Sequence, residues 1–301
     1  MPEPSPEPSI GVVVVAYRSA ATIGDCVRSC LTDEAVVALV VVDNSSDAKT
    51  ETVVLGFEDE RVSYRPSEND GFAAGCNAGV VEIPRDVVWL AFVNPDVELE
   101  RPLGDLIDVA AVAGAGVIGA QVESPRSPGV PSARRGVTTR RELAKAAVGS
   151  RAYAVGDLGT SPLVVDQVSG ALLLVRRKDF ERIGGFDERF ELYYEDVDLC
   201  ARAASIGGCV FVPQSWGRHV GGASAASAGG RAYVAGRVSR IRYLRKHHPG
   251  RTTEAALVAM AGVETATRAA ARSSEGGAAR RAALRAQWRE LRHPGSVRAL
   301  R

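Results

Sequence analysis

The sequence has few of the residues that build disulfide frameworks and zinc sites. Only five of its 301 residues are cysteine; they are scattered, and no two of them have the CxxC spacing. We therefore expect free, buried thiols in a reducing compartment, without a disulfide framework or a zinc site. Histidine is scarcer still, with four residues in the whole chain.

Long apolar runs are also missing. The longest tight runs, such as residues 35–42, have the length of a strand, whereas a membrane-spanning helix needs about 20 apolar residues. Residues 1–9 alternate proline with other residues and lack the basic and apolar regions of a signal peptide. The sequence therefore predicts a disordered leader over residues 1–9 and a cytoplasmic protein.

Net charge is small, but it is unevenly distributed along the chain. The formal net charge is +1, which gives no overall field for nucleic acid, and we expect no nucleic-acid partner. Residues 251–301 hold ten arginines, no lysine and four glutamates, so that this tail has a net charge of +6 and residues 1–250 one of −5. A basic tail on a mildly acidic body indicates an anionic partner for the tail.

The pattern of this tail predicts two helices. Residues 252–272 are rich in alanine, and Gly276 and Gly277 separate them from a second helix over residues 278–292. The second helix has an apolar stripe of Leu284, Trp288 and Leu291, beside a row of Arg281, Arg285, Arg289 and Arg292. Such a helix can lie on the anionic inner face of a membrane, or its stripe can pack on the catalytic domain or on a second subunit in a homodimer.

The first hundred residues alternate strands with helices. Residues 10–17 and 36–42 are continuous runs of mainly β-branched residues, typical of strands buried on both faces of a parallel sheet. Further elements are expected at residues 21–31 and 49–57 as helices, and at 62–64 and 87–93 as strands. This alternation predicts an open α/β sheet, whose ligand site lies beyond the carboxyl ends of the strands.

Polar residues stand where these strands end. Tyr17 and Asp43 follow the first two strands, and Asp96 follows the fourth, in the segment Asn94-Pro95-Asp96. A carboxylate in this position can bind a ligand or a divalent cation, although for Asp43 an Asx turn or a helix N-cap is an equal alternative. Between them, residues 69–79 contain three glycines at a spacing of four, which permits close approach of a ligand or tight packing of a helix.

A glycine motif later in the chain has the wrong context for a dinucleotide site. Residues 114–119 match GxGxxG, but the residues before them have a helical pattern and those after them a strand pattern. The dinucleotide fingerprint requires the reverse order, strand first and helix second. We therefore reject a dinucleotide site here.

The densest group of acidic residues lies in residues 190–202, FELYYEDVDLCAR. Glu195, Asp196 and Asp198 follow two tyrosines at the expected start of a helix, where the helix dipole favours ionised carboxylates. An ionised carboxylate between aromatic side chains can act as a general base toward a sugar hydroxyl, or it can merely complement the dipole. His219, followed by glycines just after an expected strand at residues 209–213, is the only histidine placed like a ligand.

Together these segments resemble the inverting glycosyltransferases of family 2, and within them the rhamnosyltransferase-like branch. The resemblance covers residues 10–250 and rests on eight motifs in the family's order. They are residues 13–17 (VVVAY), 42–47 (VDNSSD), 69–79 (NDGFAAGCNAG), 94–96 (NPD), 169–177 (SGALLLVRR), 184–188 (GGFDE), 194–199 (YEDVDL) and 219–224 (HVGGAS).

The resemblance implies a fold and a reaction. It implies an α/β GT-A fold with a mostly parallel central sheet over residues 10–250, followed by a basic helical extension over residues 251–301. The enzyme is expected to move a sugar, such as the deoxyhexose rhamnose, from a dTDP- or UDP-linked donor to a hydroxyl acceptor. The acceptor classes are saccharides of polysaccharide or cell-wall biosynthesis, lipid-linked saccharides and natural products, and the expected cofactor is Mn²⁺ or Mg²⁺.

The resemblance also assigns residues. It makes Asp196 the general base with Glu195 beside it, and Asp96 and His219 the ligands of the cation, with Asn94 at a position where an acid is common. The expected substrate-binding residues are Ala16, Tyr17, Asp43, Asn69, Gly71, Asn77, Asn94, Gly170 and Tyr194, with Tyr17 and Asp43 near the nucleotide base. No covalent enzyme intermediate is expected, in agreement with the lack of a nucleophile constellation.

Two other functions remain as alternatives. A nucleotidyltransferase should carry a glycine-rich loop and a basic residue after the first strand, whereas Tyr17-Arg18-Ser19-Ala20 contains no glycine. A non-catalytic nucleotide-sugar-binding protein would not need both Asp96 and Asp196. A test of nucleotide-sugar turnover separates this second alternative from an enzyme.

Overall fold

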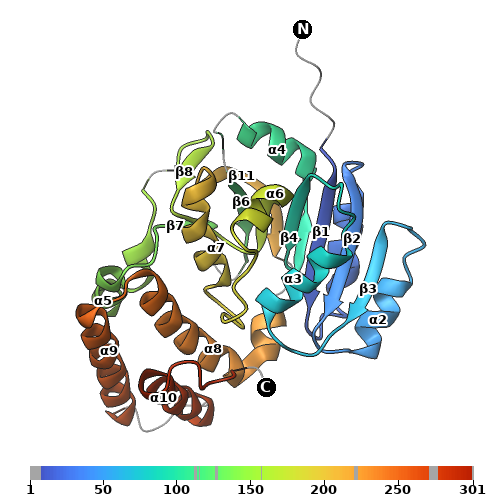
Figure 1. Ribbon diagram of the computed structural model, residues 1–301. Coiled ribbons are helices and arrows are strands. Elements are labelled where there is room, and N and C mark those ends of the chain that lie inside the picture. Colours follow the sequence, from blue (N-terminus) through green and yellow to red (C-terminus); the bar gives the residue numbers. More distant parts are fainter. Residues whose placement is uncertain are drawn as a thin grey trace.

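The computed structural model describes residues 8–111, 114, 116–125, 128–156, 158–219, 223–270 and 277–299 (Figure 1). Residues 1–7 of the expected leader and residues 220–222 of the histidine motif lie outside this part of the chain.

A mixed sheet forms the centre of the molecule. Within the described residues it has nine strands, ordered β3-β2-β1-β4-β10-β6-β11-β5, with β8 paired to β11. The parallel strands β1 (Ile10–Ala16), β2 (Val36–Asp43), β3 (Val62–Pro66) and β4 (Trp89–Val93) confirm the predicted parallel sheet. β10 (Leu172–Arg176) then runs antiparallel to both of its neighbours.

The other strands lie in the second half of the sheet or in a small sheet of their own. They are β5 (Val97–Leu99), β6 (Val117–Glu123), β7 (Ala133–Arg134), β8 (Leu163–Val165), β9 (Gln167–Val168) and β11 (Cys209–His219). β7 and β9 form a separate two-stranded sheet. The strand expected at residues 167–175 is interrupted by a turn around Gly170, and the one expected at 209–213 continues to His219.

Helices cover both faces of the sheet. α1 (Ile23–Leu31), α2 (Ala48–Leu55) and α4 (Leu103–Ala111) pack on the face that carries Val12 and Val14 of β1. α3 (Phe72–Glu82), α6 (Arg177–Arg182) and α7 (Glu195–Ala203) pack on the opposite face. The strands β1, β2 and β4 are therefore largely buried on both sides, which explains their apolar sequences, whereas β3 at the edge is partly exposed.

The spaced glycines of α3 allow tight packing. A Cβ atom at Gly79 would lie 2.4 Å from Val13 Cγ1, and one at Gly75 would lie 2.8 Å from Val15 Cγ1. Both distances are too short for a real side chain, so these glycines let α3 lie directly on β1. Of the two predicted roles, helix packing is the one that Gly75 and Gly79 have.

The rejection of a dinucleotide site is confirmed by the order of elements. α4 ends at Ala111, before the glycine motif, and β6 begins at Val117, inside it. The motif therefore joins a helix to a strand, and no helix N-terminus follows it to bind a diphosphate.

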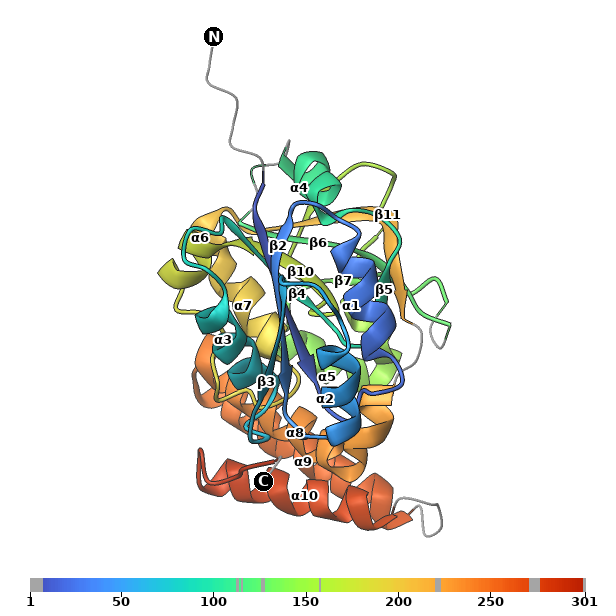
Figure 2. The same cartoon turned by 90° about the vertical axis from the view of Figure 1, so that its right-hand side faces the viewer.

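Helices also form a separate layer below the sheet (Figure 2). This layer contains α8 (Ala223–His247), α9 (Arg251–Ala270) and α10 (Gly277–Arg292), while α5 (Thr139–Val148) and the 3₁₀ helix η1 (Gly149–Tyr153) lie beside it. The two predicted tail helices are confirmed as α9 and α10, whereas α8 had no counterpart in the sequence-based prediction. Phe190, Val197, Leu244, Leu257 and Met260 form a third apolar cluster, which joins α7 to α8 and α9.

α10 packs through a different stripe from the predicted one. Ala283, Gln287 and Glu290 are buried, whereas the predicted Leu284, Trp288 and Leu291 are half-buried. The indole N–H of Trp288 donates a hydrogen bond of 3.2 Å to Thr265 Oγ1 on α9, and Leu291 packs on the third apolar cluster. The stripe therefore packs within the protein, and the four arginines of the adjoining row are exposed.

No helix among the described residues is long and apolar enough to cross a membrane.

Candidate active site

A cavity of about 1530 Å³ lies between the carboxyl ends of the strands and the helical layer. Nine of the predicted residues line it: Tyr17, Asn69, Asn94, Asp96, Gly170, Tyr194, Glu195, Asp196 and His219. They come from segments far apart in the sequence, and the fold brings them to one place. The strand-end wall of the cavity is formed by Tyr17, Asn44, Asn94, Asp96 and His219, and the helical wall by Leu143, Lys145, Arg231, Tyr233, Arg240 and Val263.

The other predicted substrate-binding residues do not line this cavity. Ala16 is fully buried within β1. Gly71 precedes α3 with a φ of 108°, and a Cβ atom there would lie 2.2 Å from the carbonyl oxygen of Glu191. Asn77 donates to the carbonyl of Phe186 at 2.9 Å and accepts from its N–H at 3.0 Å. Gly71 and Asn77 thus hold α3 against the segment that leads to α7.

Asp43 is also outside the cavity, because its carboxylate is used within its own loop. Oδ1 accepts from the N–H and hydroxyl of Ser45 at 2.9 and 2.6 Å. Oδ2 accepts from the N–H of Asp47 at 2.9 Å and from the Tyr64 hydroxyl at 3.0 Å. This is the Asx-turn arrangement that was the alternative to ligand binding.

Asn44, the next residue, faces the cavity instead. Its Nδ2 donates to the carbonyl of Gly71 at 2.9 Å, which fixes the orientation of the amide. Its Oδ1 is buried and has no hydrogen-bond partner among the described residues. A buried acceptor without a partner is costly, so Asn44 is suited to accept a hydrogen bond from a ligand. The sequence offered a signal for this residue, since it directly follows a strand end.

Asp96 and His219 meet through the pairing of β5 with β11. His219 lies opposite Val97 in this antiparallel pair, and its Nδ1 lies 3.4 Å from Asp96 Oδ1. One carboxylate and one imidazole suit Mn²⁺ or Mg²⁺ when oxygens of a diphosphate and water supply the remaining ligands. No cluster of three or more His, Cys, Asp or Glu side chains that could hold a metal ion occurs in the described part of the chain.

The backbone before α7 is strained. Tyr193 has a φ of 64° and Tyr194 one of 71°, in the left-handed region that tyrosine avoids. Each such residue costs on the order of 1–3 kcal/mol and persists only where its surroundings hold it. The hydroxyl of Tyr194 donates to Glu142 Oε1 at 3.2 Å, and its ring packs on Tyr243 with a centroid distance of 5.6 Å. The turn directs the first two residues of α7 into the cavity.

The first two carboxyl groups of α7 have different environments. Asp196 Oδ2 accepts from the N–H of Gly170 at 3.0 Å, and Oδ1 accepts from the N–H of Val197 at 2.8 Å. Burial raises the pKa of Asp196, while these hydrogen bonds and the charge of Arg134 oppose the rise. Asp196 thus has a raised proton affinity and two fixed hydrogen bonds, which suit a general base.

Glu195 lacks such support. Its side chain is 7% exposed, and its Oε2 has no hydrogen-bond partner among the described residues. Burial, and then the charge of Asp196, raise the pKa of Glu195 well above its usual value. This shift is opposite in direction to the one that the helix dipole favours, because the loss of hydration on burial outweighs the dipole.

The third carboxylate of the motif, Asp198, belongs to the opposite side of α7. It is fully buried, and its Oδ1 lies 2.6 Å from Lys246 Nζ and 2.7 Å from His247 Nε2. Arg202 binds the other oxygen at 2.8 Å. Burial opposes ionisation of Asp198, but these three partners together lower its pKa. Asp198 therefore ties α7 to the end of α8.

A polar network forms the base of the helical wall. Glu142 of α5 is 3% exposed and accepts hydrogen bonds from the hydroxyls of Tyr153 and Tyr194. Arg240 of α8 lies 3.6 Å from Glu142 and donates to Glu264 of α9 at 3.1 Å. The network joins three helices to the strained turn. Apart from Tyr194, the sequence-based prediction missed it, because its residues stand in no recognisable motif.

Comparison with known proteins gives the family. A sequence model of glycosyl transferase family 2 matches residues 11–184, more than half of the chain. A second model, described as the N-terminal domain of galactosyltransferase, matches residues 158–221.

Two curated relatives are rhamnosyltransferases. The chain is 30% identical over 226 residues to the N-acetylglucosaminyl-diphospho-decaprenol L-rhamnosyltransferase of Mycobacterium tuberculosis, covering 68% of this chain and 73% of that protein. It is 47% identical to the rhamnosyltransferase WbbL of Escherichia coli over 47 residues, which are 16% of this chain and 18% of that one.

Solved structures of glycosyltransferases share the fold. The mannosyltransferase PcManGT from Pyrobaculum calidifontis, in complex with GDP-Man and Mn²⁺, matches with a TM-score of 0.57 at 16% identity, over 95% of this chain and 88% of that one. GalNAc-T7 with UDP, GalNAc and Mn²⁺ matches with a TM-score of 0.57 at 14% identity, over 72% and 44% of the two chains. The fold is the expected GT-A fold, and the chain belongs to glycosyltransferase family 2, where its curated relatives include rhamnosyltransferases.

Proposed function

We propose that this glycosyltransferase moves a deoxyhexose such as rhamnose from a dTDP- or UDP-linked donor to a hydroxyl of a saccharide, lipid-linked or natural-product acceptor. The transfer inverts the anomeric configuration and depends on Mn²⁺ or Mg²⁺. The observation that carries the proposal is that Asp196 shares one cavity with Asp96 and His219. The two rhamnosyltransferase relatives support the choice of sugar.

Asp196 is the general base of the proposed reaction. It takes the proton of the acceptor hydroxyl, and that oxygen forms a bond to the anomeric carbon on the face opposite the diphosphate. The bond from the anomeric carbon to the diphosphate oxygen breaks with its electron pair, so the configuration inverts in one displacement. The N–H groups of Gly170 and Val197 hold the carboxylate in place for the proton transfer.

The strand-end wall binds the donor. Asp96 and His219 would hold the cation, which when bound would supply Lewis-acid stabilisation of the charge on the leaving diphosphate. Tyr17 and Asn44 stand at the ends of β1 and β2 and contact the nucleotide base. Asp43, the residue first expected there, acts through the loop that its carboxylate organises.

A donor screen tests the proposal. Thermal shifts are recorded with Mn²⁺ and a panel of dTDP- and UDP-sugars, followed by release of the nucleotide diphosphate with each stabilising donor. We expect one or more of these donors to raise the melting temperature and to turn over. Stabilisation without turnover supports the non-catalytic alternative, and the absence of stabilisation by every donor contradicts the proposal.

We also propose that the protein is cytoplasmic and that the arginine row of α10 contacts the anionic inner face of the membrane. These exposed guanidinium groups support electrostatic contact, while the packing of Trp288 on α9 argues against deep insertion. Co-sedimentation with phosphatidylglycerol vesicles should weaken with salt and with Arg281→Gln plus Arg285→Gln. These charge substitutions are a better test than deletion of the chain from Gly276 onward, because α10 packs on α8 and its deletion would also remove that packing. The homodimer stays a prediction.

A further inference from the structure

Residues 297–299, which follow α10, contact the segment that leads into the strained turn before α7. The side chains of Val297 and Ala299 are buried. The N–H of Ala299 donates a hydrogen bond of 2.7 Å to Oε2 of Glu191, a side chain that is itself only 4% exposed. Glu191 stands two residues before Tyr193, the first of the two strained tyrosines. A segment 108 residues later in the sequence thus reaches the start of the turn.

Arg242 of α8 connects the same two segments. Its guanidinium group donates to the carbonyl oxygens of Arg189 and Val297, both at 2.6 Å, and lies 3.8 Å from Glu191 Oε1. Glu290 of α10 accepts from this guanidinium at 3.0 Å and from the N–H of Val297 at 3.3 Å. Because the burial of charged groups is costly unless they are paired, these contacts fix residues 189–191. We call Arg242, Glu290 and residues 297–299 the strap.

The backbone of Glu191 is held from a second direction. Its carbonyl oxygen accepts a hydrogen bond of 2.6 Å from the N–H of Phe72, at the start of α3. Beyond the turn, α7 is held in turn by Asp198, which is bound to the end of α8. The chain from Glu191 to Glu195 therefore spans two fixed points.

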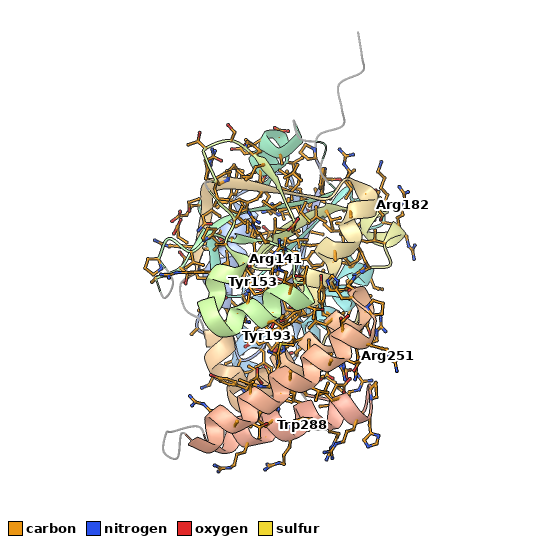
Figure 3. The ribbon with its side chains drawn as sticks, turned by 90° about the vertical axis from the view of Figure 1, so that its left-hand side faces the viewer. Arg141, Tyr153, Arg182, Tyr193, Arg251 and Trp288 are labelled. Atoms are coloured by element: carbon orange, nitrogen blue, oxygen red, sulfur yellow. The ribbon has the colours of Figure 1, made fainter. Side chains whose placement is uncertain are left out.

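The strained turn lies between these fixed points. Tyr193 and Tyr194 have positive φ values, which cost free energy and persist only where the surroundings impose them. A Cβ atom at Gly236 of α8 would lie 3.4 Å from the ring of Tyr193, which Figure 3 shows between α5 and the layer of α8, α9 and α10. This contact with α8 orients the turn, while Glu191 fixes the point at which it begins.

We propose that Glu191 and the strap are positioning elements for catalysis, which hold the strained turn so that Asp196 faces the reacting hydroxyl. Without them the two tyrosines would relax toward negative φ values, and the start of α7 would shift. The proposal rests on the proposed function, because Glu191 acts through Asp196. It gives residues 297–299 a part in catalysis that is separate from the membrane contact of the arginine row.

Steady-state kinetics of Glu191 variants test the proposal. Glu191→Ala removes the acceptor of the Ala299 N–H and should lower kcat about tenfold, or about 1.4 kcal/mol. The KM for the donor and the affinity for dTDP or UDP with Mn²⁺ should stay near those of the unchanged protein, because the strand-end wall binds the donor. Glu191→Gln keeps an oxygen for the same N–H and should restore most of kcat. Ala299→Pro removes the N–H instead and should reproduce the loss, whereas Arg298→Ala, at the exposed neighbouring residue, should not.

Hydrogen exchange measures the turn without any substrate. The amide hydrogens of residues 192–197 should exchange at least about tenfold faster in Glu191→Ala and in Ala299→Pro, while those of β1 and β2 keep their rates. Unchanged exchange at residues 192–197 in both variants overturns the proposal, even if kcat falls. Faster exchange throughout the chain also overturns it, because the strap would then only stabilise the fold.

A double-mutant cycle tests whether Glu191 acts through the strain. Glycine adopts a positive φ at little cost, so a protein with Tyr193→Gly should depend less on the strap. The loss of kcat caused by Glu191→Ala should shrink from about tenfold to about threefold when it is measured in the Tyr193→Gly background. Equal losses in the two backgrounds would contradict the proposal.

The unchanged protein separates this proposal from the proposed function. If it binds donors but turns none of them over, the proposed function fails, and the exchange experiment still decides whether the strap holds the turn. If it is active and Glu191→Ala is equally active, the strap alone is rejected.

Discussion

The strand-end wall and the helical wall of the cavity are built in opposite ways. Asn44 and Asp96 of the first are 6% and 4% exposed, and the sheet or hydrogen bonds fix them in place. Tyr233 and Val263 of the second are about half exposed, on helices that pack through their other faces. A sheet edge thus supplies a few polar atoms at fixed positions, which suits a cation and a diphosphate. Helix surfaces supply a broad exposed surface of side chains, which suits a larger ligand bound through contacts that depend little on direction.

The largest effect is expected where the two walls meet. Asp196→Asn should lower kcat by roughly 10²–10⁴-fold, the usual contribution of a general base, with donor affinity unchanged. Steady-state kinetics and calorimetry with the nucleotide diphosphate measure the two quantities. Burial raises the pKa of Asp196. On acidification, kcat/KM should therefore begin to fall at a higher pH than it would with a general base that has the usual pKa of aspartate.

Glu195→Gln is the matched comparison for this variant. Burial already favours the neutral form of Glu195, so an uncharged side chain of the same shape should cost far less activity than Asp196→Asn. An inactive Glu195→Gln enzyme beside an active Asp196→Asn enzyme would require the two roles to be exchanged.

The next largest effect is expected on stability, from the ion pairs of Asp198 that connect α7 to α8. Asp198→Ala leaves Lys246, His247 and Arg202 without their shared anion and should lower the free energy of unfolding by about 3–5 kcal/mol. The pKa of Asp198 is lowered in the fold, so its contribution is present at neutral pH and is lost as the pH falls through that pKa. Urea unfolding measures the loss.

Asp25→Ala is the control for Asp198→Ala. Asp25 forms an exposed pair with Arg28 at 2.5 Å, and its loss should cost less than about 1 kcal/mol. Equal stability of the two variants would contradict the role given to Asp198.

The strand-end wall is tested through its cation ligands. Loss of residues outside the first coordination sphere already weakens metal binding about 10–100-fold, so Asp96→Ala and His219→Ala should each weaken Mn²⁺-dependent binding of the nucleotide diphosphate by at least about tenfold. Calorimetry with and without Mn²⁺ measures the change. Arg218→Ala, at an exposed neighbour of His219 paired with Glu98, should have no such effect. Unchanged metal-dependent binding in His219→Ala would leave Asp96 as the sole protein ligand.

The smallest effect is expected in the polar network at the base of the helical wall. Glu142→Gln keeps an oxygen for Tyr194 but removes the charge beside Arg240, and should lower kcat about fivefold, or about 1 kcal/mol, through the position of the strained turn. Tyr153→Phe also removes a hydrogen bond to Glu142 but leaves its contact with Tyr194 intact, so kcat should stay near normal. A loss of melting temperature without a loss of kcat would make Glu142 merely structural.

Local sequence patterns predicted the strand-end wall well. Continuous apolar strands followed at once by Tyr17, Asn94 or Asp96 place these residues at one edge of the sheet, whatever the rest of the chain does. The same patterns could not separate Asp43 and Asp198 from functional carboxylates. Their roles depend on partners such as Tyr64, Lys246 and His247, which only the folded chain brings near.

The helical wall could not be predicted in this way. The first half of α8 is rich in alanine, glycine and serine and has no clear apolar period, and its large buried aliphatic residues, Val238, Ile241 and Leu244, lie in its second half. Tyr233 and Val263 stand 37 and 67 residues beyond Asp196. Their position depends on how α8 and α9 pack, which no local signal encodes.

The exposure of the helical wall also bears on how such enzymes diversify. Tyr233, Val263 and Leu143 hold little of the fold together, and substitutions at surface positions of this kind usually change stability by less than about 0.5 kcal/mol. By contrast, Gly75 and Gly79 leave no space for even one added methyl group. Substitutions at these three exposed positions should therefore leave the folded enzyme intact, which makes them suitable first positions for directed evolution of the helical wall.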